Sequence, residues 1–319
     1  MPQRPRTLFA CSLLALTLSG TTVVRAADTA PTPTEIFAPG TISGPAGVDC
    51  LTFTPDGATV FFDQQAGWNG FIMESHRVDS GWSTPRIASF SGQWLDHDPA
   101  MAPDGSFLVY TSNRADVPGG PALHGGHLWR VDRSGIGWGA PVRLPDAVND
   151  APHIYAPSVA ANGEVYYQRM DEPGHQFHLY RTAYRDGHYQ PPQRLALGDP
   201  AAHELDPAIA PDQSFIVFDA NYAGKDKPDR LYIAFRQGDG WSAPVDLGDA
   251  VNRYEPWGSH LSPDARTLYF TSNYTTKVHY PRSSAQARTD LERMRVWDNG
   301  NNHIWSVSLA PWLDAHRAM

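Results

Sequence analysis

Cysteine is scarce in this chain, because Cys11 and Cys50 are the only two among 319 residues. Cys11 lies within an apolar stretch near the N-terminus, which leaves Cys50 as the only cysteine of the rest of the chain. A framework of intramolecular disulfides is therefore excluded, even for a protein in an oxidising compartment. We interpret Cys50 as a small buried hydrophobic residue and not as a nucleophile.

Long hydrophobic runs are also lacking. One apolar stretch, Leu8–Leu18, follows two arginines and precedes a small-x-small site at Val24–Ala26. It is too short to span a bilayer stably, and its flanks are typical of a secretory signal. We predict a signal peptide at residues 1–26, a flexible Pro/Thr-rich leader at residues 27–33, and a periplasmic or secreted product without membrane insertion.

Clusters of positive charge are missing as well. The formal net charge is −9, and lysine and arginine form no run. Duplex nucleic acid and anionic membrane surfaces are therefore poor partners. The catalytic and metal-binding motifs HExxH, CxxC, EF-hand loop, Gly-rich phosphate loop and GxSxG elbow are also absent from the sequence, so no motif assigns an enzyme class.

Glycine, proline and tryptophan are abundant by contrast, with 27, 28 and 10 residues. This composition favours many short strands joined by tight turns. Five segments align with one another on a Pro-Asp-Gly-like turn between two apolar stretches, which predicts a β-hairpin in each. They are Leu51–Phe62, Ala100–Tyr110, Ser158–Tyr167, Ala208–Phe218 and His260–Phe270. The turns recur at intervals of 48, 58, 50 and 52 residues.

Each hairpin is followed by a third alternating stretch. A Trp-x-x-Pro element then leads to a fourth strand in most units, as at Trp82–Pro85, Trp138–Pro141 and Trp241–Pro244. Four strands repeated about every 50 residues describe propeller blades. We predict an all-β fold in which residues 34–319 form a single five-bladed β-propeller.

The last unit lacks a fourth strand. The segment beginning at Glu35 stands where the fourth strand of a preceding blade belongs, and its pairing with the last blade would close the ring. A six-bladed ring is the alternative, but it needs a degenerate repeat that the sequence does not show. The last unit also contains an insertion with a predicted helix at Ser284–Trp297, which either covers a channel mouth or caps the blade edge.

The units Asp98–Gly105 and Leu205–Asp212, with the Thr-Ser-Asn segments after their hairpins, resemble the WD40-like propeller repeats of the TolB type. The resemblance spans nearly all of the chain after the signal. It implies a periplasmic or secreted propeller, in a family that contains protein-binding modules and some enzymes acting on sugars or uronides. The separate N-terminal domain and the six blades of TolB itself are not seen.

The segments that precede the five first strands are rich in ionisable side chains. A ring fold brings equivalent positions together around one axis, so these residues are candidates for a shared pocket. The candidate ligand-binding residues are Asp49, Asp96, His97, His153, Tyr155, His203, Glu204, Arg253, Glu255, Trp257 and His260. For Asp98 and Asp206 we predict a structural role instead, as hydrogen-bond acceptors for the backbone of the neighbouring blade.

Two functions remain open at this point. The first is a monomeric binding propeller for a protein or a glycan of the cell envelope. The second is a hydrolase or lyase acting on a carbohydrate, with a His/Asp/Glu site at one channel mouth. Carboxylate pairs serve as acid and base on a glycosidic bond, and converging imidazoles and carboxylates hold a divalent metal, so no cofactor is fixed by sequence.

Overall fold

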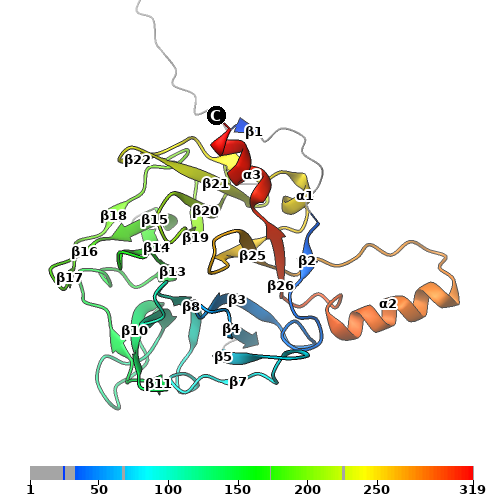
Figure 1. Cartoon of the computed structure of the whole chain (residues 1–319), viewed down its shortest axis with the longest axis horizontal. Helices are drawn as coiled ribbons and strands as arrows, with labels where there is room; N and C mark the ends of the chain where they lie inside the picture. Colours follow the sequence, from blue (N-terminus) through cyan, green and yellow to red (C-terminus); the bar gives the residue numbers. More distant parts are fainter. Residues whose placement is uncertain (1–23, 26–32, 67–68, 173, 225–226, 319) are drawn as a thin grey trace, which may run out of the picture.

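The fold is a five-bladed β-propeller, in which five small antiparallel sheets surround a central axis (Figure 1). The computed structural model describes residues 24–25, 33–66, 69–172, 174–224 and 227–318. The first strands, nearest the axis, are β3 (Val48–Phe53), β8 (Asp96–Met101), β13 (Ile154–Val159), β19 (Glu204–Ile209) and β24 (Trp257–Leu261). The second strands are β4 (Thr59–Ala66), β9 (Phe107–Ser112), β14 (Val165–Asp171), β20 (Phe215–Ala220) and β25 (Thr267–Ser272).

The outer strands complete each blade. The third strands are β5 (Asn69–Val78), β10 (His127–Ser134), β15 (Gln176–Thr182), β21 (Arg230–Gln237) and β26 (His303–Ser308). The fourth strands are short: β7 (Arg86–Ile87), β12 (Val142–Arg143), β18 (Gln193–Arg194), β23 (Val245–Asp246) and β2 (Glu35–Ile36). Further two-residue strands are β1 (Val24–Arg25), β6 (Gly81–Trp82), β11 (Gly137–Trp138), β16 (Tyr184–Arg185), β17 (His188–Tyr189) and β22 (Gly240–Trp241).

The Trp-x-x-Pro elements lead into the fourth strands, as predicted, and each first folds back on the third strand of its blade. In three blades the tryptophan pairs with an arginine of the third strand, whose guanidinium lies over the indole ring. The distances from guanidinium carbon to ring centroid are 5.2 Å for Arg77–Trp82, 4.3 Å for Arg133–Trp138 and 4.0 Å for Arg236–Trp241. Such cation–π pairs stabilise the outer edge of each blade.

The ring closes through its N-terminal strand, as predicted. Strand β2 pairs antiparallel with β26, with Glu35 opposite Ser306 and Ile36 opposite Trp305. The next residue, Phe37, donates its N–H to the Ile304 carbonyl at 2.8 Å. Its ring lies edge-on to that of Phe53 in the first blade, at 5.8 Å between centroids. The closing segment therefore joins the last blade to the first.

Hydrophobic side chains fill the spaces between neighbouring blades. Between the first and second blades, for example, buried Phe61 and Ile72 pack with Tyr110 and Trp129. Two helices that the sequence did not predict also occur, α1 (Asp249–Asn252) and α3 (Ala310–Arg317). The expectation of one short helix was therefore wrong; in α3, Pro311 stands in the first turn, where proline is tolerated.

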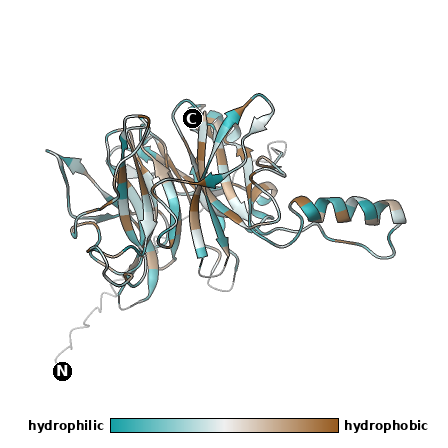
Figure 2. Cartoon of the chain, turned by 90° about the horizontal axis from the view of Figure 1, so that it is seen from below, coloured by the Kyte–Doolittle hydropathy of each residue, from teal (hydrophilic) through white to brown (hydrophobic). Residues whose placement is uncertain are grey.

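The predicted insertion helix is present as α2 (Ser284–Val296), with a capping box at Ser283. Neither expected role is correct. Helix α2 extends away from the ring, and none of its residues is buried (Figures 1 and 2). Trp297, directly after the helix, packs on Trp305 at 5.3 Å between ring centroids and fixes the base of this arm.

Among the described residues, no helix is long and apolar enough to cross a membrane. The predicted signal peptide falls almost entirely outside the described residues. Of it only β1 is described, and it pairs in parallel with β23.

Candidate functional site

The five first strands all begin on one side of the ring and end on the other. We call these the strand-start side and the turn side, since each strand ends in a Pro-Asp-Gly-like turn. On the strand-start side, one first-strand residue of each blade pairs with the equivalent residue of the second strand. We call these five first-strand residues the mouth residues. They are Asp49, His97, Tyr155, Leu205 and Trp257, all half-buried.

Tyr155 is held in place by its neighbours. Its ring stacks on His97 at 5.8 Å and on His153 at 6.2 Å between centroids, and its hydroxyl lies 3.1 Å from His153 Nδ1. A Cβ atom on Gly126 would stand 2.3 Å from the Tyr155 ring, so this position requires glycine. His124 adds a further edge-on ring against His153 at 5.3 Å. The result is a partly exposed ladder of aromatic and imidazole rings beside the axis.

Directly after each mouth residue, the first strand carries a β-bulge. The bulge residue has positive φ in all five blades, between 35° and 63°. We call these five residues the bulge ring: Cys50, Asp98, Ala156, Asp206 and Gly258. Bulges re-aim the chain and are frequent beside functional sites. Here they turn five backbone N–H groups toward the preceding blade.

Each N–H group of the bulge ring has a side-chain acceptor on the blade before it. The Asp98 carboxylate accepts from Ala156 at 3.0 Å, and Asp206 accepts from Gly258 at 2.9 Å. The predicted structural role of these two aspartates is confirmed. The other three acceptors lie on second strands: Asp63 for Asp98, Gln168 for Asp206 and Thr271 for Cys50.

Asp98 and His97 form a tight polar pair. Nδ1 of His97 lies 3.0 Å from Oδ2 of Asp98. Burial disfavours the charged form of each group, but the attraction and hydrogen bond between the two side chains outweigh this effect. The pKa of Asp98 is therefore lowered and that of His97 is raised. Thr111 and Ala156 also donate to Oδ2, so the Asp98 carboxylate is stabilised in its ionised form.

Other carboxyl groups around the axis are less fully hydrogen-bonded. One oxygen each of Asp49 and Asp63 is buried without a hydrogen-bond partner among the described residues, and the buried Asp219 carboxyl interacts with that of Asp206. Burial raises the pKa of Asp49 to about 6, and burial together with the Asp98 charge raises that of Asp206 to about 7. Burial also raises the pKa of Asp63 and Asp219 well above the usual range. The axis is thus rich in buried carboxyl groups that favour a proton or a cation.

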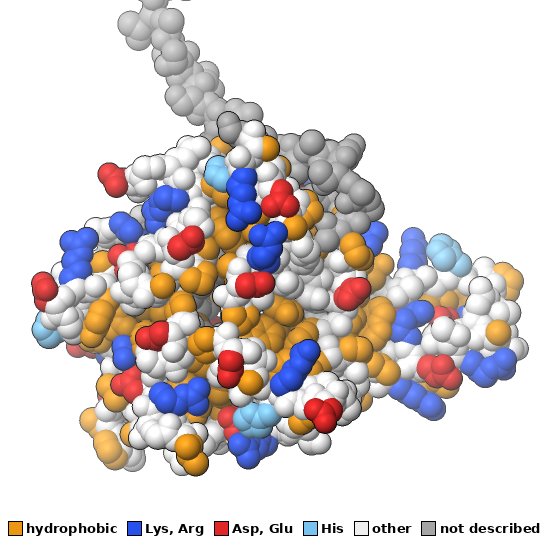
Figure 3. Space-filling view, in the orientation of Figure 1, with side chains coloured by type: hydrophobic (Ala, Val, Ile, Leu, Met, Phe, Trp, Pro, Cys, Tyr) orange, Lys and Arg blue, Asp and Glu red, His pale blue; other side chains and the backbone are white. Residues whose placement is uncertain are grey.

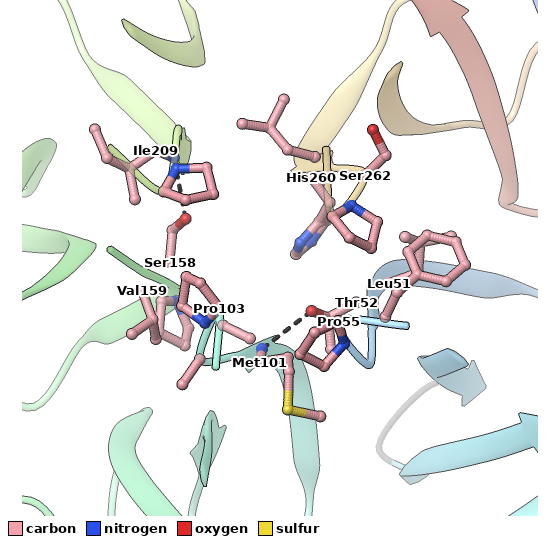
Figure 4. A pocket seen from close by; sticks show the side chains of 17 residues that line it. Leu51, Thr52, Pro55, Met101, Pro103, Ser158, Val159, Ile209, His260 and Ser262 are labelled. Carbon is pink, nitrogen blue, oxygen red and sulfur yellow. Dashed lines mark hydrogen bonds between the residues drawn. The ribbon is translucent and has the colours of Figure 1, made fainter. Parts of the chain in front are cut away.

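The turn side of the channel is different in character. A cavity of about 240 Å³ opens there, rimmed by the turn residues Pro55, Pro103, Pro211 and Pro263. Its lining is mixed: apolar side chains alternate with the polar residues Thr52, Ser158, His260 and Ser262. Figure 3 shows hydrophobic side chains gathered at this centre, with separate acidic side chains around them. In Figure 4 the imidazole of His260 points into the cavity. Burial lowers its pKa to about 4, so it is neutral at pH 7.

The four histidines predicted to share one pocket are therefore divided. His97 and His153 flank Tyr155 on the strand-start side, while His260 lines the turn-side cavity. His203 is engaged elsewhere, with Nε2 at 2.7 Å from Asp229 Oδ1. His97 and His153 precede the bulge of their strands, whereas His260 follows it. Sequence spacing alone does not reveal this difference.

Asp96 and Glu204 are buried carboxylates that accept hydrogen bonds from nearby residues, so they are not exposed for ligand binding. Asp96, fully buried, accepts hydrogen bonds from Ser91, Ser112 and the Gly92 N–H. Glu204, 2% exposed, accepts from Tyr222 at 2.6 Å.

Two remaining candidates, Arg253 and Glu255, are exposed on the strand-start side. Arg253 donates to the Tyr254 hydroxyl and lies over that ring. Glu255 has φ of +49°. The structure therefore leaves Asp49, His97 and Trp257, with Tyr155 and His153, as the candidates grouped at the strand-start mouth.

The sequence reasoning missed Asp63 and Asp219. Both stand at the same position of a second strand, directly after Val-Phe-Phe or Ile-Val-Phe. An acidic residue within such an apolar strand is the signal that would have found them, because burial of an unpaired carboxylate is costly.

No protein-family profile and no curated protein matches this chain. Solved structures do resemble it. The α-L-arabinofuranosidase from Lactobacillus brevis matches with a TM-score of 0.52 and 11% identity, over 85% of this chain and 92% of that one. The putative TolB from Agrobacterium tumefaciens gives 0.49 and 16%, over 83% and 91%. TolB from Acinetobacter baumannii gives 0.47 and 12%, over 82% of this chain and 54% of that one.

At these identities the resemblance concerns the fold alone. The arabinofuranosidase match supports the propeller architecture of the present chain. It does not transfer an activity, a ligand or a residue role.

Proposed function

We propose that this chain is a binding propeller of the cell envelope that holds a glycan at its strand-start mouth. One observation carries the proposal: the five mouth residues combine a carboxyl, an imidazole, a phenol, an indole and an aliphatic side chain around one axis, all half-buried. Sugars present apolar ring faces and hydroxyl edges, and such a mixture of aromatic and polar groups matches both.

The export of the chain is part of this proposal. Residues 1–26 act as a signal peptide, so the mature protein begins at Ala27 and works in the periplasm or outside the cell. N-terminal sequencing of the exported protein tests this. An uncleaved start would contradict it.

Binding is tested on an array of neutral and uronic-acid-containing oligosaccharides, followed by calorimetric titration of the strongest binder. Tyr155→Ala and Trp257→Ala are expected to weaken binding at least tenfold, since each removes an aromatic face from the mouth. Tyr184→Ala is the matched control, because Tyr184 is 40% exposed on the outer hairpin of the third blade. Equal effects of all three changes, or no glycan bound by the wild type, would contradict the proposal.

A second function has a specific observation in its favour. The carboxyl groups of Asp49 and Asp98 are neighbours, and their pKa values are shifted in opposite directions. The pKa of Asp49 is raised to about 6 and that of Asp98 is lowered. That division is characteristic of an acid and a base acting on a glycosidic bond. Hydrolysis of the bound oligosaccharide by the wild type, lost in Asp49→Asn while binding persists, would make the protein a glycoside hydrolase. Binding without turnover would leave it a lectin-like propeller.

A further inference from the structure

We propose that the bulge ring holds a divalent transition metal of the zinc type, bound by the Cys50 sulfur and a carboxylate oxygen each of Asp63 and Asp98. The three ligand atoms lie within 4.8 Å of one another, and all three residues are buried. Zinc takes cysteine sulfur at about 2.3 Å and carboxylate oxygen at about 2.0–2.2 Å. A small inward movement of the side chains would bring all three atoms to those distances.

The ligands come from three different strands and are placed by the backbone. Cys50 and Asp98 are equivalent bulge residues of the first and second blades, and Asp63 lies on β4 between them. The Asp98 N–H donates to Asp63 Oδ2 at 2.7 Å, which holds the two aspartates together. A Cβ on Gly258 would stand 3.1 Å from the Cys50 sulfur, so the thiol lies against the bulge residue of the neighbouring last blade.

The free lone pairs point to a ligand independently of this clustering. Asp63 is 0% exposed, and its Oδ1 has no hydrogen-bond partner. The hydrogen bonds to the Asp98 carboxylate from His97, Thr111 and Ala156 all go to Oδ2, so none of these three occupies Oδ1. Buried polar groups are almost always paired, and a bound cation would satisfy the bare Asp63 oxygen.

The chemistry of the set selects the metal class. A thiolate favours zinc and related soft or borderline ions, whereas calcium and magnesium prefer six or more oxygens. Two carboxylates and one thiolate leave coordination positions for water or for Asp206, which faces the same ring. The site lies beneath the mouth residues, and its existence does not depend on glycan binding.

The test uses the full chain, stripped with a chelator and titrated with Co²⁺. One Co²⁺ per chain is expected, with the near-ultraviolet absorption of a sulfur-to-cobalt charge transfer, and Zn²⁺ is expected to displace it. Zn²⁺ should also raise the Tm of the stripped wild type by about 5 °C at a concentration of 100 times Kd. The absence of both the band and the shift would overturn the proposal, as would displacement by Ca²⁺ and not by Zn²⁺.

Two substitutions identify the ligands. Cys50→Ser is expected to lose the charge-transfer band, and Asp63→Asn to bind Co²⁺ at least tenfold more weakly. Asp56→Asn, an exposed turn carboxylate, is the control and should bind like the wild type. A folded Cys50→Ser protein that keeps the band would overturn the assignment. If a variant does not fold, the wild-type band and Tm shift still decide whether a thiolate-bound metal exists.

Discussion

The two ends of the same five strands differ in chemistry. On the turn side, the repeat imposes proline rims and apolar walls, and the hydroxyls that occur there are occupied by backbone: Thr52 accepts from the Met101 N–H and Ser158 from the Ile209 N–H (Figure 4). On the strand-start side, no two mouth residues are alike. The bulge ring separates these regions, so the repeat maintains the fold at one end and leaves the other end free for recognition.

Both sides of the channel depend on a closed ring, and opening that ring should have the largest effect on stability. A chain beginning at Pro39 lacks the β2 pairing and the Phe37 ring that contacts Phe53. We expect it to lose several backbone hydrogen bonds and a packed aromatic side chain, at a cost of about 3–5 kcal/mol. Chemical denaturation against a chain beginning at Pro33 measures this. Equal midpoints for the two chains would mean that β2 does not close the ring.

The strand-start half of the channel should be more sensitive to loss of one acceptor than the turn-side half. Asp98→Ala removes an oxygen that accepts hydrogen bonds from three donors, including the buried Ala156 N–H. Ser158→Ala removes the acceptor of the Ile209 N–H only. With the metal stripped, we expect losses of about 3 kcal/mol and about 1 kcal/mol in the free energy of unfolding. Urea titration of both variants measures them. A larger loss for Ser158→Ala would reverse the comparison.

The sequence predicts the turn side well because its features are local. The Pro-Asp-Gly turns, the alternating strands and the missing fourth strand of the last unit depend on neighbouring residues, and the observed register follows them. The helix at Ser284–Val296 is local in the same way.

The strand-start side is predicted only in part, because its geometry depends on the bulge. A bulge shifts the register by one residue, so it decides which of two consecutive side chains reaches the axis. His97 and Tyr155 were recognised, but Asp96 and Glu204, one residue earlier, face into their own blades. Asp63 and Asp219 reach the axis from the second strands, which no repeat alignment centred on the first strand reveals.

The buried carboxyl groups give the strand-start half a pH dependence of its own. The pKa of Asp206 is raised to about 7 in the folded protein, mainly by burial and then by Asp98, from an ordinary value of 3.8. The folded state therefore holds this proton more tightly than the unfolded state does. The stability that this group contributes is complete below pH 3.8 and is lost as the pH rises through 7.

Asp206→Asn cannot ionise, and its side-chain oxygen still accepts from the Gly258 N–H. In metal-free protein, the Tm of the variant minus that of the wild type should therefore increase from pH 4 to pH 8. His260, with its pKa lowered to about 4, acts in the opposite direction but is present in both proteins and cancels. Thermal melts across this range test the difference. A difference that stays constant or decreases with pH would show that Asp206 is ionised throughout.

The smallest effect should come from the α2 arm, which belongs to neither mouth. None of its residues is buried, and Leu291 and Met294 are 48% and 51% exposed. Replacement of residues 284–289 by a Gly/Ser linker of equal length keeps the ion pairs of Arg293 with Asp290 and buried Asp298, and should therefore change the free energy of unfolding by no more than about 0.5 kcal/mol. Glycan binding at the strand-start mouth should be unchanged too.

Trp297→Ala is the matched change at the base of the arm. It removes a ring packed on Trp305, in the cluster that joins the last two blades, and should cost about 2 kcal/mol or more. Urea denaturation of the two variants, with calorimetry of glycan binding, separates the arm from its base. A weaker glycan affinity in the linker variant would show that the arm reaches the mouth in solution, and the strand-start site would then extend beyond the ring.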